Sequence, residues 1–126
     1  MARILIVEDN PVNLKLASVI LESEGYVTEG AADAEEATEI ITYQVPDLIL
    51  MDLGLPGKDG YAFTRELRAR AETSAVPILA VTSFAMKGDK TKAMEAGCNG
   101  HLTKPIDRQA LLATVRDLLG GKAVAG

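Results

Sequence analysis

Short continuous runs of Val, Ile and Leu alternate along this chain with longer segments whose apolar residues recur at helical spacing. Such runs are typical of strands buried on both faces of a parallel sheet, and their alternation with helices is typical of βαβ units. Five strand–helix pairs fit into the 126 residues. The pattern therefore predicts an α/β fold, with a doubly wound parallel sheet and helices on both faces.

The bounds of the expected elements follow from the apolar runs and from residues that begin or end helices. Strands are expected over about residues 3–7, 26–29, 48–51, 78–81 and 101–102. Helices are expected to begin at Asn10, Asp33, Asp59, about Lys87, and Asp107. Their expected ends are Gly25, a position before Pro46, about Arg70, Gly97, and the pair Gly120 and Gly121. A flavodoxin-like (βα)5 sheet in the order 2-1-3-4-5 is one doubly wound arrangement with this pattern.

Length and charge limit the kinds of protein that this chain can be. Its 126 residues fit one domain, because no second core has room. With 13 basic and 18 acidic residues, the net charge is −5. Nucleic-acid binding is not expected, since it needs clustered basic residues.

The N-terminal region and the single cysteine indicate a cytoplasmic protein. The apolar run at residues 4–7 is too short for a signal sequence or a membrane span, so no membrane association is expected. Cys98 is the only cysteine, which excludes an internal disulfide and suits a reducing compartment. We interpret it as a small packing residue.

Polar and charged residues stand at the ends of the expected strands. They are Glu8 and Asp9 after the first run, Asp52 after the third, Thr82 after the fourth and Lys104 after the fifth. Because parallel strands share one carboxyl edge, these side chains are expected to meet there. Clustered carboxylates repel one another unless a cation compensates, and Mg²⁺ binds both carboxylate and phosphate oxygens. A carboxylate can also attack phosphorus to form an acyl phosphate, which an ammonium and a hydroxyl would stabilise.

Four separated motifs resemble those of response regulator receiver domains. They are Glu8-Asp9-Asn10, Asp52 with Gly-Leu-Pro-Gly-Lys-Asp-Gly after it, Val81-Thr82-Ser83, and Lys104-Pro105. The intervals from Asp9 to Asp52, Asp52 to Thr82, and Thr82 to Lys104 are 43, 30 and 22 residues. The resemblance covers about residues 2–119. Residues 83–89 and Ala96-Gly97-Cys98 are similar to single-domain regulators of the DivK type and to receiver modules of hybrid histidine kinases.

The resemblance implies a role for each acidic residue of the expected site. Asp52 would be the phosphoacceptor, and Asp9 and Asp52 would bind Mg²⁺ directly. Gly54 stands where the family uses a backbone carbonyl as a metal ligand, and Glu8 where the contact runs largely through metal-bound water.

The remaining motif residues would bind the phosphoryl group and transmit its presence. Thr82, with Ser83 beside it, would bind the phosphoryl group and move on activation, while Lys104 would pair with that group. Pro105 matches the position of a cis-peptide proline. His101 stands where the family commonly has Tyr or Phe as a switch residue. We therefore expect a weaker or pH-sensitive switch, or else an ordinary surface histidine.

The resemblance also implies a signalling role rather than a separate enzymatic one. Residues 1–121 would form the receiver domain, and residues 122–126 a short tail. The domain would take phosphate from a histidine kinase or a histidine phosphotransfer protein and switch the binding of a downstream protein effector. Since Gly54 and an apolar Phe84 flank the site without a group that orients water, we expect slow self-hydrolysis of the acyl phosphate.

Three other kinds of protein fit parts of the pattern. An aspartyl-phosphate phosphatase commonly has a second acid two residues after its nucleophile, where this chain has Gly54. A flavin-binding module shares the fold class, but no aromatic clamp stands out among three Tyr and two Phe. A scaffold with the receiver fold that works without phosphorylation stays open, although none of the acidic, Thr or Lys site residues is missing.

Overall fold

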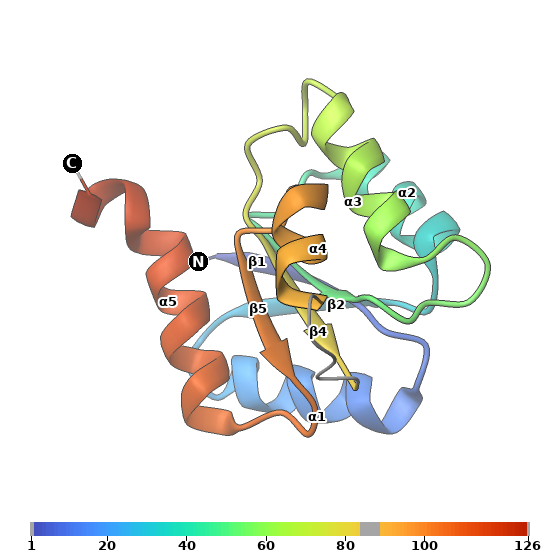
Figure 1. Ribbon diagram of the computed structural model, residues 1–126. Coiled ribbons are helices and arrows are strands. Elements are labelled where there is room, and N and C mark those ends of the chain that lie inside the picture. The colour runs from blue at the N-terminus through green and yellow to red at the C-terminus, as the bar shows by residue number, and fades with distance from the viewer. Residues whose placement is uncertain (1, 84–88, 126) are drawn as a thin grey trace.

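The computed structural model describes residues 2–83 and 89–125, which form five strands and five helices in alternation (Figure 1). The strands are β1 (Arg3–Val7), β2 (Val27–Ala31), β3 (Leu48–Asp52), β4 (Ile78–Thr82) and β5 (Gly100–Thr103). The helices are α1 (Pro11–Glu22), α2 (Ala34–Tyr43), α3 (Gly60–Ala69), α4 (Asp89–Ala96) and α5 (Arg108–Ala125).

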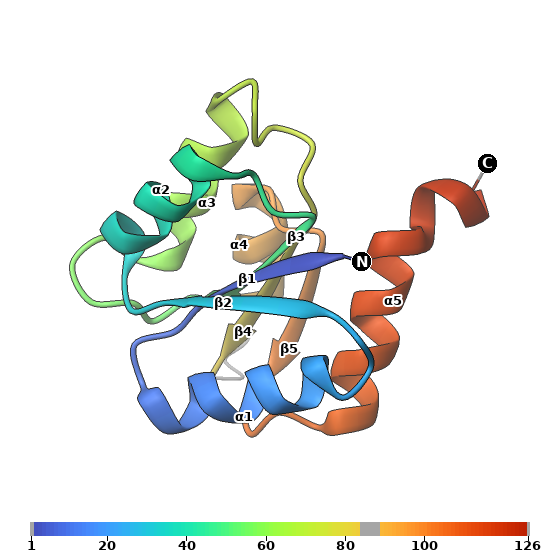
Figure 2. The ribbon, with the colours of Figure 1, turned by 180° about the vertical axis from the view of Figure 1, so that it is seen from behind.

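All strand pairs in the sheet are parallel, and the strand order is β2-β1-β3-β4-β5. This order confirms the flavodoxin-like (βα)5 prediction. The chain runs from β1 through α1 to β2, which lies at the edge of the sheet beside β1. It then returns through α2 to β3 on the other side of β1, so that β1 lies between β2 and β3 (Figure 2). The order reverses between β1 and β3, which is where ligands bind in open α/β sheets.

The sheet separates two apolar layers. Helices α1 and α5 cover one face, where Leu21 and Leu111 pack with Leu50 of β3. Helices α2, α3 and α4 cover the other face (Figures 1 and 2), where Phe63 of α3 packs with Met51 of β3. Helices cover both faces of the sheet, and all five residues of β3 and all five of β4 are buried. The predicted doubly wound core is confirmed.

Side-chain caps begin four of the helices at the predicted residues. Asn10 Oδ1 accepts from the amides of Val12 and Asn13 at 2.9 and 3.1 Å. Asp33, Asp59 and Asp107 each accept an amide hydrogen bond from the residue three positions on, at 2.8 Å. These acceptors satisfy amides that a helix leaves without an intrahelical partner.

Several expected boundaries are wrong, and those of β2 and α5 have a clear physical reason. Strand β2 covers Val27–Ala31 rather than residues 26–29, because its pairing with β1 runs on to Ala31. Helix α5 continues to Ala125 and does not end at Gly120 and Gly121. Glycine in a helix costs only about 1 kcal/mol relative to alanine, so a glycine without a positive φ need not end one. The expected start of the fourth helix near Lys87 lies outside the described residues.

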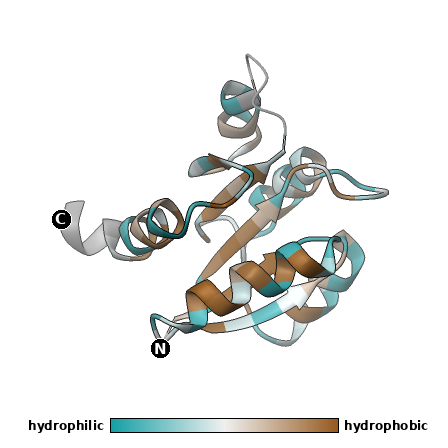
Figure 3. Ribbon diagram, turned by 90° about the horizontal axis from the view of Figure 1, so that it is seen from below, coloured by the Kyte–Doolittle hydropathy of each residue, from teal (hydrophilic) through white to brown (hydrophobic). Residues whose placement is uncertain are grey.

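Helix α1 carries apolar side chains on its outer surface. Hydrophobic residues recur along it (Figure 3), and Val12, Leu16 and Val19 are exposed to solvent. In residues 2–83 and 89–125, no helix is both long and apolar enough to cross a membrane.

Candidate functional site

Three carboxylates converge at the carboxyl edge of the sheet. Glu8 and Asp9 follow β1, and Asp52 is the last residue of β3, next to it in the sheet. One oxygen from each residue lies within 4.8 Å of the other two. Glu8 and Asp52 are only 6 and 7% exposed, whereas Asp9 is open to solvent. The predicted acidic cluster is therefore present, with two buried members and one accessible member.

Lys104 brings a positive charge into this cluster from the loop after β5. Its ammonium donates to Glu8 Oε1 at 2.5 Å and lies 3.5 Å from Asp52 Oδ2. The backbone of Lys104 is fixed as well, because its amide donates to the carbonyl of Thr82 at 2.7 Å. The two ends of β4 and β5 are thus joined beside the acidic cluster.

Burial and charge pairing act together on the ionisation of this site. Burial raises the pKa of Glu8, although hydrogen bonds from Lys104 and from the Asn10 amide oppose the rise. Burial by itself would lower the pKa of Lys104, but the hydrogen bond to Glu8 and the charge of Asp52 raise it above its ordinary value. Lys104 therefore remains charged, and it compensates part of the negative charge of the cluster.

The other expected site residues lie around this centre. Thr82 ends β4 and is buried, and Ser83 follows it at the exposed surface. The amide of Gly54 donates to Asp52 Oδ1 at 3.0 Å. The Lys104–Pro105 peptide bond is cis.

His101 lies on β5, and its side chain is half-buried. Its Nε2 atom is inaccessible to solvent and has no hydrogen-bond partner in the described part of the chain. A surface histidine would have water at this nitrogen, so a fully solvated side chain is excluded. Phe84, which is expected from the sequence to flank the site, lies outside the described residues.

The donor set of the acidic cluster suits Mg²⁺. This ion binds carboxylate oxygens, usually through one or two carboxylates, and retains several waters. The exposed carboxylate of Asp9 leaves one side of the cluster open to those waters. Soft ligands are not part of the cluster, since its members are all carboxylates. The residues present therefore fit a hard divalent cation.

The family model for the response regulator receiver domain matches residues 4–116 of the chain. The chain belongs to the response regulator receiver domain family. Receiver domains are signalling domains of two-component systems, and they work with histidine kinases and downstream effectors. In this chain, the acidic cluster and Lys104 lie together at the carboxyl edge of the sheet.

Individual relatives support the assignment to this receiver family. The polar-differentiation response regulator DivK of Brucella ovis is 38% identical over 117 residues, which are 93% of this chain and 95% of DivK. A receiver domain of a Pseudomonas aeruginosa PAO1 sensor histidine kinase has 41% identity and a TM-score of 0.86, over 94% of this chain and 98% of that one. That structure holds a magnesium ion in its active-site cleft. The receiver domain of a Syntrophus aciditrophicus histidine kinase has 34% identity and a TM-score of 0.88, over 96 and 92% of the chains.

Gly60 lies directly against the backbone at the end of β3, where Asp52 stands, and the sequence did not reveal this role. A Cβ atom at Gly60 would lie 2.6 Å from the backbone oxygen of Asp52 and 2.7 Å from Leu53 Cα. Only glycine lets α3 begin so close to the end of β3. The signal in the sequence was a glycine directly after the Asp59 cap, where most other residues favour a helix more.

Gly60→Ala is expected to destabilise the protein by about 1–3 kcal/mol, because the new methyl group collides with backbone atoms. Gly120→Ala is the matched control, since a Cβ at that helical position meets nothing within 4 Å. The control is expected to be neutral or to stabilise by up to about 1 kcal/mol. Urea unfolding measures both changes, and equal effects at the two positions would contradict the close approach at Gly60.

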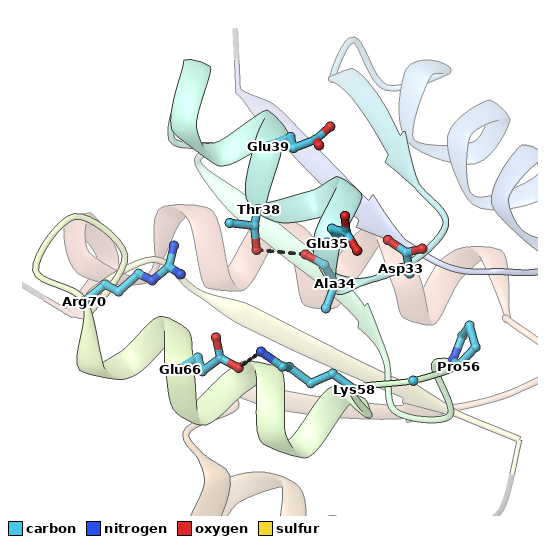
Figure 4. Close-up of a pocket in the computed structure, with 10 residues that line it drawn as sticks. Asp33, Ala34, Glu35, Thr38, Glu39, Pro56, Lys58, Glu66 and Arg70 are labelled. Atoms are coloured by element: carbon cyan, nitrogen blue, oxygen red, sulfur yellow. Dashed lines mark hydrogen bonds and ion pairs between the residues drawn. The ribbon is translucent and has the colours of Figure 1, made fainter.

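A separate cleft of about 510 Å³ lies between α2 and α3 (Figure 4). Glu35 and Glu39 of α2 line one wall, and Arg70 lines the other. Lys58 and Glu66 form an ion pair within it. None of the carboxylates of the acidic cluster lines this cleft, so the cleft is separate from that cluster.

Proposed function

We propose that this receiver domain accepts a phosphoryl group from a phosphohistidine on Asp52, in a magnesium-dependent reaction, and thereby switches its binding to a protein partner. The observation that carries this proposal is the convergence of Glu8, Asp9 and Asp52 beside the Lys104 ammonium. A carboxylate nucleophile, a cation site and a fixed positive charge are the parts that phosphoryl transfer to an aspartate needs.

Asp9 and Asp52 would hold the ion directly, Glu8 through a water molecule, and Gly54 through its backbone carbonyl. The magnesium-bearing receiver of the Pseudomonas histidine kinase supports this assignment by likeness. When bound, Mg²⁺ neutralises charge on the phosphoryl oxygens and orients them.

In the transfer step, a carboxylate oxygen of Asp52 attacks phosphorus. The bond between phosphorus and the donor imidazole nitrogen breaks, and its electron pair returns to the imidazole. The product is an acyl phosphate on Asp52 and an unphosphorylated histidine. The hydrogen bond from the Gly54 amide at 3.0 Å orients the carboxylate before the attack.

Lys104 would pair with the transferred phosphoryl group, since its ammonium already lies 3.5 Å from Asp52 Oδ2. Thr82 and Ser83 would donate hydroxyl hydrogen bonds to the phosphoryl oxygens. The ammonium that bonds to Glu8 is then shared with the new anion, so the pairing within the cluster changes on phosphorylation.

The switch would combine Thr82, His101 and the elements α4, β5 and α5. Two arrangements of these elements would differ in their affinity for an effector, and phosphorylation would shift the population between them. His101 belongs to β5 and its Nε2 atom is buried, so a rearrangement of β5 would change the surroundings of this nitrogen. Its place in the switch, and the structural role of Pro105 beside Lys104, belong to this proposal.

The proposal also includes the bounds of the domain, its location, its phosphodonor and the rate of self-hydrolysis. Residues 1–121 form the receiver domain, residues 122–126 a short tail, and the protein acts in the cytoplasm. Its phosphodonor is a histidine kinase or a histidine phosphotransfer protein. Self-hydrolysis of the acyl phosphate is slow, and an acyl-phosphate half-life of only seconds would contradict that part.

The proposal is tested by incubating the protein with Mg²⁺ and acetyl phosphate and measuring its intact mass. We expect the gain of one phosphoryl group, and no gain when a chelator removes the metal. Absence of any gain, with Mg²⁺ binding shown separately, would favour a scaffold that works without phosphorylation.

The affinity for Mg²⁺ is expected to weaken as the pH falls. Burial raises the pKa of Glu8 above its ordinary value of 4.5, so a proton begins to compete with the ion at a higher pH than for an exposed glutamate. The affinity should therefore be full at about pH 8 and reduced at about pH 5. Calorimetric Mg²⁺ titrations at both pH values measure the effect. Glu8→Gln should show less of the loss, and an equal loss in the variant would place the titrating group elsewhere.

A further inference from the structure

Arg68, in the last turn of α3, joins three separate segments of the chain on the side of α3 that faces α4. Its Nε atom donates to the carbonyl of Gly97 at 2.9 Å, just after α4. Its Nη2 atom donates to Asn99 Oδ1 at 2.7 Å, just before β5. Its Nη1 atom donates to three carbonyls of the loop between α3 and β4, which are those of Thr73, Ser74 and Val76, at 3.1, 3.3 and 2.7 Å.

Asn99 extends this network to the beginning of β4. Its Oδ1 atom also accepts from the amide of Ile78 at 2.8 Å, and its own amide donates to the carbonyl of Ile78 at 2.7 Å. In the described part of the chain, β5 is an edge strand that pairs with β4 alone, so this network fixes the end at which β5 enters the sheet.

The charge of Arg68 is compensated by carbonyl dipoles. In the described residues, no carboxylate forms an ion pair with it. The guanidinium lies where α3 and α4 both end, and a helix carries partial negative charge at its C-terminus. Burial lowers the pKa of Arg68, but arginine stays charged in proteins.

Apolar packing holds α4 only weakly. Within residues 90–96, the buried side chains are those of Ala93 and Ala96, while Met94 is 44% exposed. Two alanine side chains bury far less apolar surface than the leucine and valine side chains that fix α5. The Lys92 ammonium adds a contact with the Tyr61 ring, 5.2 Å from its centroid. The polar anchor at the C-terminal end is therefore a large part of what positions α4.

Gly97 lets the anchor form. Its φ of +117° is a conformation that favours glycine, and a Cβ there would lie 2.6 Å from Arg68 Cγ. The arginine stem thus packs directly against the backbone that follows α4.

We propose that Arg68 is the pivot of α4. It fixes the C-terminal end of the helix and the beginning of β5, so that displacements of α4 are swings of its N-terminal end about residues 97–99. The N-terminal end is the one that follows Thr82 and Ser83 in the chain. A swing of this kind would connect the acidic cluster to the surface of α4. This consequence rests on the proposed function, whereas the pivot itself does not.

The test is amide hydrogen exchange on the unphosphorylated full chain, without Mg²⁺ or a phosphodonor. In the wild type, protection should rise along α4 toward its C-terminal end and be highest at the amides of Cys98 and Asn99, which donate to Ala93 and Ile78. Arg68→Met keeps the apolar stem and removes all the donors. We expect it to lower protection at residues 97–99 by about 10-fold or more, with less than about 3-fold change in β1 and β3.

Two further variants separate the pivot from a general structural role. Arg65→Met makes the same change at an exposed position of the same helix, and it should leave all these rates unchanged. Arg68→Lys should rescue the protection only in part, because one ammonium cannot replace a planar group that spans five acceptors. The proposal is overturned if Arg68→Met reduces protection equally in β1, β3 and residues 97–99, or if it leaves residues 97–99 protected. Because no phosphorylation is involved, these outcomes are independent of whether Asp52 accepts a phosphoryl group.

Discussion

Asp52→Asn is expected to abolish the gain of a phosphoryl group from acetyl phosphate. The amide is a far weaker nucleophile than the carboxylate, and the substitution also removes one of the direct metal ligands proposed here. We expect the rate of incorporation to fall by at least about 100-fold, with no phosphorylated species in the intact-mass spectrum. Asp52→Asn should also lose most of the rise in melting temperature that Mg²⁺ gives the wild type. A ligand raises the melting temperature by binding the folded state, so a weaker affinity for Mg²⁺ gives a smaller rise.

The matched control is Asp117→Asn, which changes the same functional group at an exposed position of α5. It should be phosphorylated as fast as the wild type. Asp52→Asn should itself remain folded, since the Lys104 ammonium keeps its 2.5 Å hydrogen bond to Glu8. Phosphorylation of a folded Asp52→Asn variant would show that another residue accepts the phosphoryl group.

The sequence predicted the acidic cluster well because its position depends on topology rather than on exact element boundaries. Glu8 and Asp52 each end a buried run, and parallel strands bring such ends to one edge even if a boundary shifts by a residue. The observed end of β3 at Asp52 rather than Met51 changes nothing in this argument. The place of Lys104 in the cluster was predictable for the same reason, since the fifth apolar run ends at the same edge of the sheet.

Other features could not be predicted, since they depend on packing between distant segments. The pattern of β2 is weak because it is an edge strand with exposed residues, and only its register with β1 fixes its extent. Helix α5 continues through Gly120, where local signals favour an end. Arg68 looks like any helical arginine in the sequence, yet its hydrogen bonds reach residues up to 31 positions away.

Phe63→Ala is expected to destabilise the protein by about 3–5 kcal/mol. The ring is fully buried in α3, where it packs in the apolar layer with Met51 and Leu53, on either side of Asp52. The substitution removes this apolar surface and leaves a cavity that the surrounding backbone closes only in part. Domains of this size are stable by about 5–15 kcal/mol, so the loss is a large fraction of the total. Urea unfolding monitored by circular dichroism measures the change.

The position of Phe63 makes the loss of stability relevant to the acidic cluster as well as to the core. Helix α3 begins at Gly60, directly against the backbone of Asp52, so loosening α3 also loosens the strand end that carries the proposed phosphoacceptor. Phosphorylation of Phe63→Ala should therefore slow even at temperatures where the variant is folded. Tyr43→Ala is the control, because that aromatic side chain is 95% exposed and its loss should cost less than about 0.5 kcal/mol. A normal phosphorylation rate in folded Phe63→Ala would mean that the site is held by β3 alone, without the support of α3.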